Sequence, residues 1–441
     1  MKGSQKTNNI KRPLAGRDPD ASGPRVRQRI RSRCLLPVSA PPIFNGSMVI
    51  ESGLIRDIGP WDHIRKLYSG NTLDMGESVV MPGLINAHCH LEYTGMAEKF
   101  DPPTSFTQWI RQMIDLKKFW TQADFQRSWE TGYNQATVSG TTTIADNLSQ
   151  PINLSYEQLQ QGARLLALFE WIQLEGLPWN VEKQEAMEYL IRTTDQITYQ
   201  QSGLAPHAPY TTTPELWHYI QHHADLAKRP VSVHLAESQE EMDLFQKQSG
   251  PMHDWFDSIK HLPDWGTGTP VQLLENKQAL REGMIIIHAN CLNEADLRTL
   301  AKRKIGIVHC PRSHRFFRHP PFQLEHCLAH GIPMALGTDS LASVRPDQHP
   351  DSLSLFHEMR CFHQSFPTIS PEKIIQMVTL NAAKVIGLDH AIGSLTPGNQ
   401  ADWISLPWSG PEKELLDAII HTPSAPEKVV IGGKTVIKKQ R

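Results

Sequence analysis

The stretch Gly283-Met-Ile-Ile-Ile-His288 is a short apolar run that ends in a side chain able to bind a metal or move a proton. Such a run predicts a buried strand with a polar residue at its carboxyl end. The same pattern recurs between residues 80 and 390 in seven further runs, which end near His88, Asp146, Glu170, His207, His234, His309 and Asp339.

Amphipathic segments lie between these runs, for example at residues 214–227, 293–302 and 321–330. Strands that alternate with helices predict parallel strands joined by crossover helices. Eight such units predict an α/β fold of the (β/α)8 TIM-barrel type, in which chemistry collects at the carboxyl ends of the strands. A doubly wound sheet is the alternative, but no G-x-G-x-x-G motif opens a helix, so a dinucleotide site has no support.

The regions on either side of this middle part are rich in β-forming residues. Residues 49–59 form two short runs around Ser52-Gly53. Residues 401–406 and 429–438 are of the same kind, and Gly432-Gly433 divides the second stretch into a hairpin. These patterns predict a small composite β-sandwich domain from residues 34–80 and 393–441, beside a barrel over residues 81–392.

The composition excludes several classes of protein. With 441 residues, 39% hydrophobic and 20% charged, the chain is too long for a disulfide-stapled module and too apolar for a disordered protein. No apolar run approaches the roughly 18 residues of a membrane span, and no secretory signal is evident. The six cysteines lie far apart without a C-x-x-C pair, which favours a reducing compartment and a cytoplasmic location.

Charge is distributed unevenly along the chain. Residues 1–33 carry ten Lys or Arg and two Asp or Glu, a net charge of +8, and the remainder carries −10. An arm that touches RNA or a membrane is one interpretation. The stretch has few apolar residues and no aromatic ones, so we favour a disordered basic tail, with no nucleic acid and no membrane among the partners.

Four strand-end residues form a set of the metal-ligand type. His88 and His90 are two positions apart on one strand, so both imidazoles face the same side. Alone this pair is weak evidence, because a chain with 21 histidines contains roughly one H-x-H by chance. His234 and Asp339 complete a set that suits one divalent cation, with Zn²⁺ preferred and Fe²⁺ the alternative. Glu237 follows His234 by three residues, on a loop near the cation but not on it.

Five motifs, in order along the chain, together resemble the amidohydrolase superfamily. They are Pro82-Gly-Leu-Ile-Asn-Ala-His-Cys-His-Leu-Glu92, Pro206-His-Ala-Pro-Tyr210, His234-Leu-Ala-Glu-Ser-Gln-Glu-Glu241, His309-Cys-Pro-Arg-Ser313 and Gly337-Thr-Asp-Ser340. Residues 381–388 and 393–402 are similar to that family's closing helix and its return to the β domain. The resemblance covers about residues 34–440. Within the superfamily it points to the cytosine-deaminase-like branch of chlorohydrolases and of guanine, adenosylhomocysteine and aminofutalosine deaminases.

The resemblance implies a role for each matching residue. The implied metal ligands are His88, His90, His234 and Asp339. The implied catalytic groups are Glu237, as the proton shuttle, His288, which polarises the attacked group or the hydroxide, and Asp339, which also accepts a proton from the metal-bound water. The implied substrate contacts are Glu92 and His207. One metal is expected, because the fourth strand ends in His207 and not in the carboxylated lysine of two-metal relatives.

The implied activity is that of a metal-dependent aminohydrolase, a deaminase that releases ammonia from an aminated purine-like small molecule. Aminodeoxyfutalosine of menaquinone synthesis is a candidate substrate, because residues 310–317 and 338–343 look like those of aminofutalosine deaminases. His314 and Ser340 stand where relatives often have Asn and Gly, which leaves the substrate open. A chlorohydrolase, a cyclic amidohydrolase and a non-enzymatic barrel scaffold are the alternatives. A homo-oligomer is compatible with the resemblance.

Three further residues near these motifs have competing interpretations. His309 could replace His288 beside the metal, but we favour a structural role because Cys310-Pro follows and can turn the chain. Cys89 faces the opposite side of its strand from its two neighbours and is expected to pack. Trp109 either lines the pocket or caps a helix.

Two pairs of histidines have the spacing of one helical turn. Neither pair includes the glutamate of an H-E-x-x-H site, so we expect both on outer helix surfaces. The pairs are His218/His222 and His326/His330.

Overall fold

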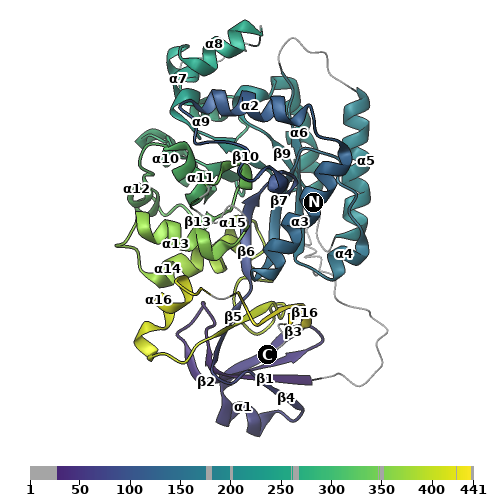
Figure 1. Cartoon of the computed structure of the whole chain (residues 1–441), viewed down its shortest axis with the longest axis vertical. Helices are drawn as coiled ribbons and strands as arrows, with labels where there is room; N and C mark the ends of the chain where they lie inside the picture. Colours follow the sequence, from purple (N-terminus) through teal and green to yellow (C-terminus); the bar gives the residue numbers. More distant parts are fainter. Residues whose placement is uncertain are drawn as a thin grey trace, which may run out of the picture.

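Eight parallel strands occupy the middle of the chain, in two four-stranded sheets (Figure 1). The computed structural model describes residues 27–174, 181–198, 202–259, 261, 268–345, 347, 352–423 and 425–438. The first sheet contains β6 (Leu84–Cys89), β7 (Thr141–Leu148), β8 (Arg164–Trp171) and β9 (Gly203–Pro206). The second contains β10 (Ser232–Leu235), β11 (Ile285–His288), β12 (Gly306–His309) and β13 (Met334–Leu336). The strands expected from the sequence are therefore present, and all neighbours pair in parallel.

The two sheets meet along both of their edges. A parallel bridge joins Leu204 of β9 to Val231 before β10, and another joins Cys89 of β6 to Asp339 after β13. At the second seam the backbone N–H groups of Thr338 and Asp339 donate to the carbonyl of His88. Gly337 permits this approach, because a Cβ there would lie 2.7 Å from that carbonyl oxygen.

Side chains at alternate positions of the strands fill the space between the two sheets. Ile285 and Ile287 of β11 pack in one buried cluster with Val308 and Ala335 of the neighbouring strands. Ile286 belongs instead to the larger cluster that contains residues of the surrounding helices. A strand that is apolar on both faces is typical of a parallel sheet covered by helices.

Helices follow the strands along the chain. Polar N-cap side chains start several of them, as Thr121, Thr269 and Asn293 do in reciprocal capping boxes. In the first half they are α2 (Phe106–Lys117), α3 (Gln122–Val138), α4 (Tyr156–Gln160), α5 (Val181–Ile197), α6 (Pro214–Ala227), α7 (Gln239–Lys247), α8 (Pro251–Ser258) and α9 (Pro270–Asn276). The later ones are α10 (Glu294–Lys302), α11 (Pro311–Phe317), α12 (Leu324–Ala329), α13 (Leu355–Ser365), α14 (Pro371–Met377), α15 (Leu380–Val385) and α16 (Leu415–Ile420). Among the described helices, none combines the length and the apolar composition needed to cross a bilayer.

Strands from both ends of the chain form one further sheet, below the parallel strands in Figure 1. It contains both parallel and antiparallel pairs and is called the mixed sheet below. Its order is β16-β15-β14-β5-β1-β2-β3, with β4 paired to β1. The strands are β1 (Arg27–Leu35), β2 (Ile43–Glu51), β3 (Leu54–Pro60), β4 (Asn71–Asp74), β5 (Ser78–Pro82), β14 (Trp403–Pro407), β15 (Lys428–Ile431) and β16 (Lys434–Lys438), with α1 (Trp61–Leu67) after β3. The composite origin predicted for this part of the chain is thus present as a sheet.

Strand β1 begins at Arg27, although the sequence analysis places a disordered tail over residues 1–33. Residues 27–33 are therefore part of the sheet, and residues 1–26 lie outside the described residues. The reason is that alternate positions of β1 hold arginines that have hydrogen-bond partners and an aromatic ring beside them in the folded chain. The guanidinium of Arg31 donates to Asp74 and Asn45, that of Arg29 donates to two backbone carbonyls, and both lie over the Trp61 ring.

Candidate active site

Three of the predicted ligands come together where β6 and β10 end. His88 lies within β6, His90 directly follows it, and His234 lies within β10. One ring nitrogen from each lies within 4.8 Å of the others, and the Nε2 atoms of His90 and His234 are 3.3 Å apart. Two nitrogens that share a tetrahedral Zn²⁺ at about 2.0–2.1 Å lie about 3.3 Å apart, so this spacing fits a shared cation.

Asp339 and His288 extend this cluster on its other side. His88, His288 and Asp339 form a second group of the same kind, and Asp339 Oδ1 lies 3.8 Å from His88 Nε2. His88 belongs to both groups, so its ring lies at the centre of the set. The structure therefore brings together all four residues predicted to hold the cation.

Unpartnered ring nitrogens provide a test of whether these residues suit a metal. Both nitrogens of His88 and the Nδ1 atom of His90 are buried without a hydrogen-bond partner. Buried polar atoms normally have partners, because leaving one unpaired costs about 1–3 kcal/mol. A cation held by these side chains would give His88 Nε2 the partner that the protein does not provide, so the donor set fits a borderline divalent metal.

The electrostatics of the cluster keep the imidazoles of His90 and His234 neutral. Burial lowers the pKa of His234 to about 3, and His207 and His88 add to the effect. Burial, followed by the nearby His88 and His234 rings, also holds the pKa of His90 well below its usual value. Burial alone would raise the pKa of Asp339, but the adjoining imidazoles hold it well below the usual range. Neutral rings and a carboxylate are the forms that bind metals.

Two serines fix the orientation of Asp339. The hydroxyl of Ser313 donates to Oδ2 at 2.7 Å, and that of Ser343 donates to the same atom at 3.0 Å. Oδ1 remains directed at His88. Second-shell hydrogen bonds of this kind orient metal ligands. Neither serine was predicted from the sequence to contact Asp339, although Ser313 is the last residue of the motif that begins at His309.

Glu237 and His288 face each other beside the ligands. Their side chains are buried, with Glu237 Oε1 3.4 Å from His288 Nε2. Burial, with contributions from Asp339 and Glu241, raises the pKa of Glu237 well above its usual value. Asn290 donates from Nδ2 to the backbone carbonyl of Glu237 at 2.9 Å. A carboxyl group in this setting can hold a proton at neutral pH and release it during a reaction.

Glu241 supports the turn that presents Glu237 and was also missed. Its carboxylate accepts the backbone N–H groups of Ala236 at 3.1 Å and of Glu237 at 2.7 Å. The signal available in the sequence was Ser238-Gln-Glu-Glu241, which resembles a capping box. Ser238 does cap α7, but the Glu241 side chain reaches further back along the chain than that motif implies.

His207 lies beside the ligands and forms a third group with Glu170 and His234. The nitrogen of His234 that faces Glu170 is Nδ1, at 3.9 Å, and it already lies 2.9 Å from the carbonyl oxygen of His207. That contact assigns the proton to Nδ1 and leaves Nε2 as the metal-binding atom. The third group therefore orients His234 and does not provide a second full set of ligands.

Glu92, the other predicted substrate contact, is fully buried. Its carboxylate accepts the backbone N–H groups of Ser149 and Gln150, together with the Ser149 hydroxyl. Burial raises its pKa to about 7. These bonds hold the loop after β7, and a contact of Glu92 with substrate stays a prediction.

The structure also places the three residues that had competing interpretations, His309, Cys89 and Trp109. His309 stacks on Phe322 and belongs to none of the metal-type groups among the described residues. Cys89 is buried, with Sγ 3.6 Å from Asp146. Trp109 lies in the first turn of α2 against Phe317, and Ser105 provides the cap of that helix.

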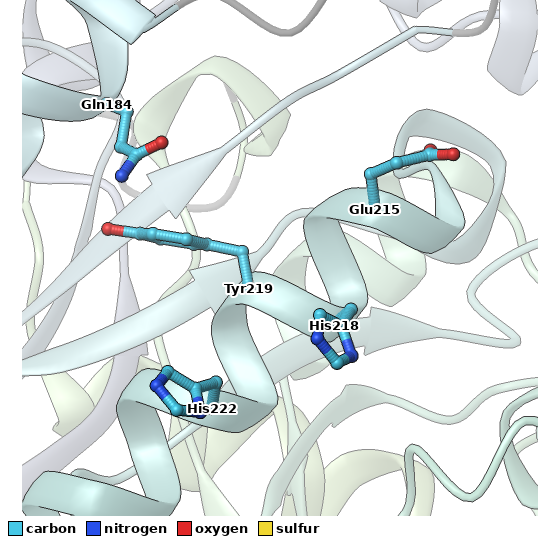
Figure 2. A pocket seen from close by; sticks show the side chains of 5 residues that line it. All are labelled: Gln184, Glu215, His218, Tyr219 and His222. Atoms are coloured by element: carbon cyan, nitrogen blue, oxygen red, sulfur yellow. The ribbon is translucent and has the colours of Figure 1, made fainter.

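The two helical histidine pairs are on the surface. His326 and His330 both approach Glu294 of α10. His218 and His222 line a hollow of about 380 Å³ between α5 and α6, together with Gln184, Glu215 and Tyr219 (Figure 2). None of these residues belongs to the strand-end groups of the described chain.

Known proteins resemble this chain over most of its length. The sequence pattern of the amidohydrolase family matches residues 79–436. A 5-methylthioadenosine/S-adenosylhomocysteine deaminase of Pyrococcus furiosus is 28% identical over 369 residues, 79% of this chain and 80% of the relative. Helicobacter pylori aminofutalosine deaminase in complex with methylthio-coformycin has a TM-score of 0.82 at 19% identity, over 93% of this chain and all of that one. A zinc-bound adenosine deaminase from Xanthomonas campestris has a TM-score of 0.79 at 21% identity, over 93% and 92%.

Proposed function

Because this chain belongs to the amidohydrolase family, we propose that it is a metal-dependent aminohydrolase that releases ammonia from an aminated purine-like ring. The observation that carries the proposal is the convergence of His88, His90, His234 and Asp339, with ring nitrogens left unpartnered between them. The names of the relatives support a deaminase: they are deaminases of adenine nucleosides or of aminofutalosine.

Each residue of the cluster has a proposed task. A divalent cation, Zn²⁺ in the first instance, supplies Lewis-acid activation of water when bound. His88, His90 and His234 would hold it through ring nitrogens, and Asp339 would hold it through Oδ1 and accept a proton from the attacking water. Glu237 carries a proton on its buried carboxyl and passes it to the leaving amine. His288 lies 3.4 Å from Glu237 and would polarise the attacked group or the hydroxide.

Substrate choice is a separate part of the proposal. His207 and Glu92 are the proposed substrate contacts. Methylthioadenosine, adenosylhomocysteine and aminodeoxyfutalosine all carry the amine that this chemistry removes. The last of these would place the protein in menaquinone synthesis.

The architecture suggests further proposals. We take the parallel strands as one closed (β/α)8 barrel over residues 81–392, since bridges cross both seams. We take the mixed sheet as a sandwich from the two ends of the chain, because the hairpin turns at its opposite edges meet: a Cβ on Gly53 would lie 2.6 Å from the Gly432 carbonyl oxygen. The six free cysteines favour the cytoplasm.

Two variants and a substrate panel test the proposed activity. We expect the purified protein with Zn²⁺ to release ammonia from at least one of adenosine, methylthioadenosine, adenosylhomocysteine, guanine and aminodeoxyfutalosine. Glu237→Gln should keep the cation and lose turnover by about 10²–10⁴-fold, the usual size of a general acid–base contribution. His234→Ala should lose the cation and turnover together. A Glu237→Gln variant with full activity, or no ammonia from any substrate, would contradict the proposal.

A further inference from the structure

A second group of metal-type side chains lies outside the strand-end site, where α13 meets α16. It consists of His363 near the end of α13, Asp417 in α16 and His421 directly after α16. The two helices pack against each other, and in Figure 1 α16 lies between α14 and the mixed sheet. No role in the proposed reaction draws on these residues.

The spacing within this group matches that of the central ligands. His363 Nδ1 and His421 Nε2 are 3.2 Å apart, compared with 3.3 Å between the Nε2 atoms of His90 and His234. Asp417 Oδ1 lies 3.7 Å from the same Nε2 atom of His421. We infer that His363, Asp417 and His421 form a peripheral site for a second divalent cation of the Zn²⁺ type.

Hydrogen bonding between the side chains accounts for only part of this arrangement. His421 Nε2 lies 3.2 Å from His363 Nδ1, a hydrogen-bond distance, but 3.7 Å from Asp417 Oδ1, which is too long for a hydrogen bond. A cation among the three atoms is bound by all of them at once. Two imidazoles and one carboxylate suit Zn²⁺, Co²⁺ or Ni²⁺ better than Mg²⁺ or Ca²⁺, which prefer oxygen ligands.

The backbone around the group is held in place by other contacts. The guanidinium of Arg360 on α13 donates to the carbonyl oxygens of Ile420 at 3.5 Å and of Thr422 at 3.0 Å, on either side of His421. Its positive charge is matched by these carbonyls at the end of α16. The backbone that carries His421 is therefore fixed against α13 before a cation binds, and the cation would act as a clip between the two helices.

Zinc stoichiometry tests the inference directly. The full chain is freed of metal with a chelator and titrated with Zn²⁺ alone, and the tightly bound metal is measured by elemental analysis. We expect two equivalents for the parent chain and one for His363→Ala and His421→Ala. His326→Ala is the matched control, a surface histidine on α12 beside an acid, and should keep two. His234→Ala should lose the other equivalent, so that the two sites are distinguished.

A second measurement keeps the inference testable if an alanine variant folds poorly. Asp417→Asn removes the carboxylate charge but keeps the side-chain shape, and it should weaken the second equivalent without changing the first. Zn²⁺ should raise the midpoint of thermal unfolding more in the parent chain than in this variant. A parent chain that binds only one equivalent, or a His421→Ala variant that still binds two, would overturn the peripheral site.

Discussion

Three residues at the strand ends have left-handed backbone angles, with φ of +51° at Ala236, +70° at His288 and +52° at Asp339. Side chains other than glycine adopt this region at a cost, and such strain collects at functional sites. In β11 regular alternation would direct residue 288 to the same side as Ile286. The left-handed turn interrupts that alternation, and the His288 ring lies 5.8 Å from the His88 ring.

Glu241 accepts the N–H of the strained Ala236 next to Glu237, so substitution of Glu241 should disturb the position of Glu237. In Glu241→Gln only one side-chain oxygen can accept, so the N–H groups of Ala236 and Glu237 cannot both be satisfied. We expect kcat to fall about 10-fold, less than for a direct acid–base group, because Glu241 acts through the turn that presents Glu237. KM and bound Zn²⁺ should stay unchanged. Asp243→Asn, an acid on the same helix α7, is the matched control and should leave kcat unchanged. An equal loss in both variants would assign Glu241 a general structural role.

The same substitution should change the pH dependence of stability. Burial raises the pKa of Glu241 from 4.5 to about 7, so the folded chain holds this proton more tightly than the unfolded chain. Stability from this group is fully present below about pH 4.5 and is lost as the pH rises through about 7. The shift corresponds to about 3 kcal/mol. Urea unfolding in the presence of a chelator should show a weaker decline in Glu241→Gln than in the parent chain; equal slopes would argue against it.

Among the secondary-structure elements, the parallel strands were predicted from the sequence, whereas the first part of β1 was not. The parallel strands were predictable because each is an apolar run that ends in a polar residue. The four proposed ligands were identified among the residues at those strand ends. Residues 27–33 read as a charged tail because the partners of Arg29 and Arg31 lie more than ten residues away in the sequence. The contacts of Ser343 and Glu241 were hidden for a related reason, since they depend on backbone angles that local pattern does not specify.

Truncation tests the start of this strand. A chain that begins at residue 34 loses most of β1, which pairs with β2, β4 and β5 in the middle of the sheet. It also loses the buried Ile30, and that burial alone stabilises the fold by about 1.5–3 kcal/mol. We expect a lower midpoint of thermal unfolding than for a chain that begins at residue 27. Equal midpoints for the two chains would show that β1 contributes little.

At the scale of the whole molecule, a buried ion pair joins the mixed sheet to the beginning of the barrel strands. Arg164 at the start of β8 donates to Asp402 at 2.5 Å, and both side chains are at most 6% exposed. The second carboxylate oxygen of Asp402 accepts the N–H of Gly432, and its backbone carbonyl accepts that of Gly83. One acid therefore connects three segments that are distant in the sequence.

Breaking this pair should destabilise the fold strongly. Arg164→Met leaves the Asp402 charge buried without its partner, and the expected loss in free energy of unfolding is about 3–5 kcal/mol. The double variant Arg164→Met/Asp402→Asn should recover part of that loss, which a double-mutant cycle measures. Arg298→Met, in an exposed pair with Glu294, is the control and should change stability by less than about 1 kcal/mol. A loss in the double variant that equals the sum of the losses in Arg164→Met and Asp402→Asn would contradict the coupling.

The seam between β6 and β13 has a consequence for how the protein is made. The backbone of Asp339 pairs with His88 and His90, which lie about 250 positions earlier in the chain. A nascent polypeptide has therefore synthesised roughly three-quarters of its length before the first and last proposed ligands can meet. On the proposed ligand set, zinc cannot be captured in its final geometry during early translation. Loading must await the synthesis of residue 339, and any product released by the ribosome before that point would lack a functional centre.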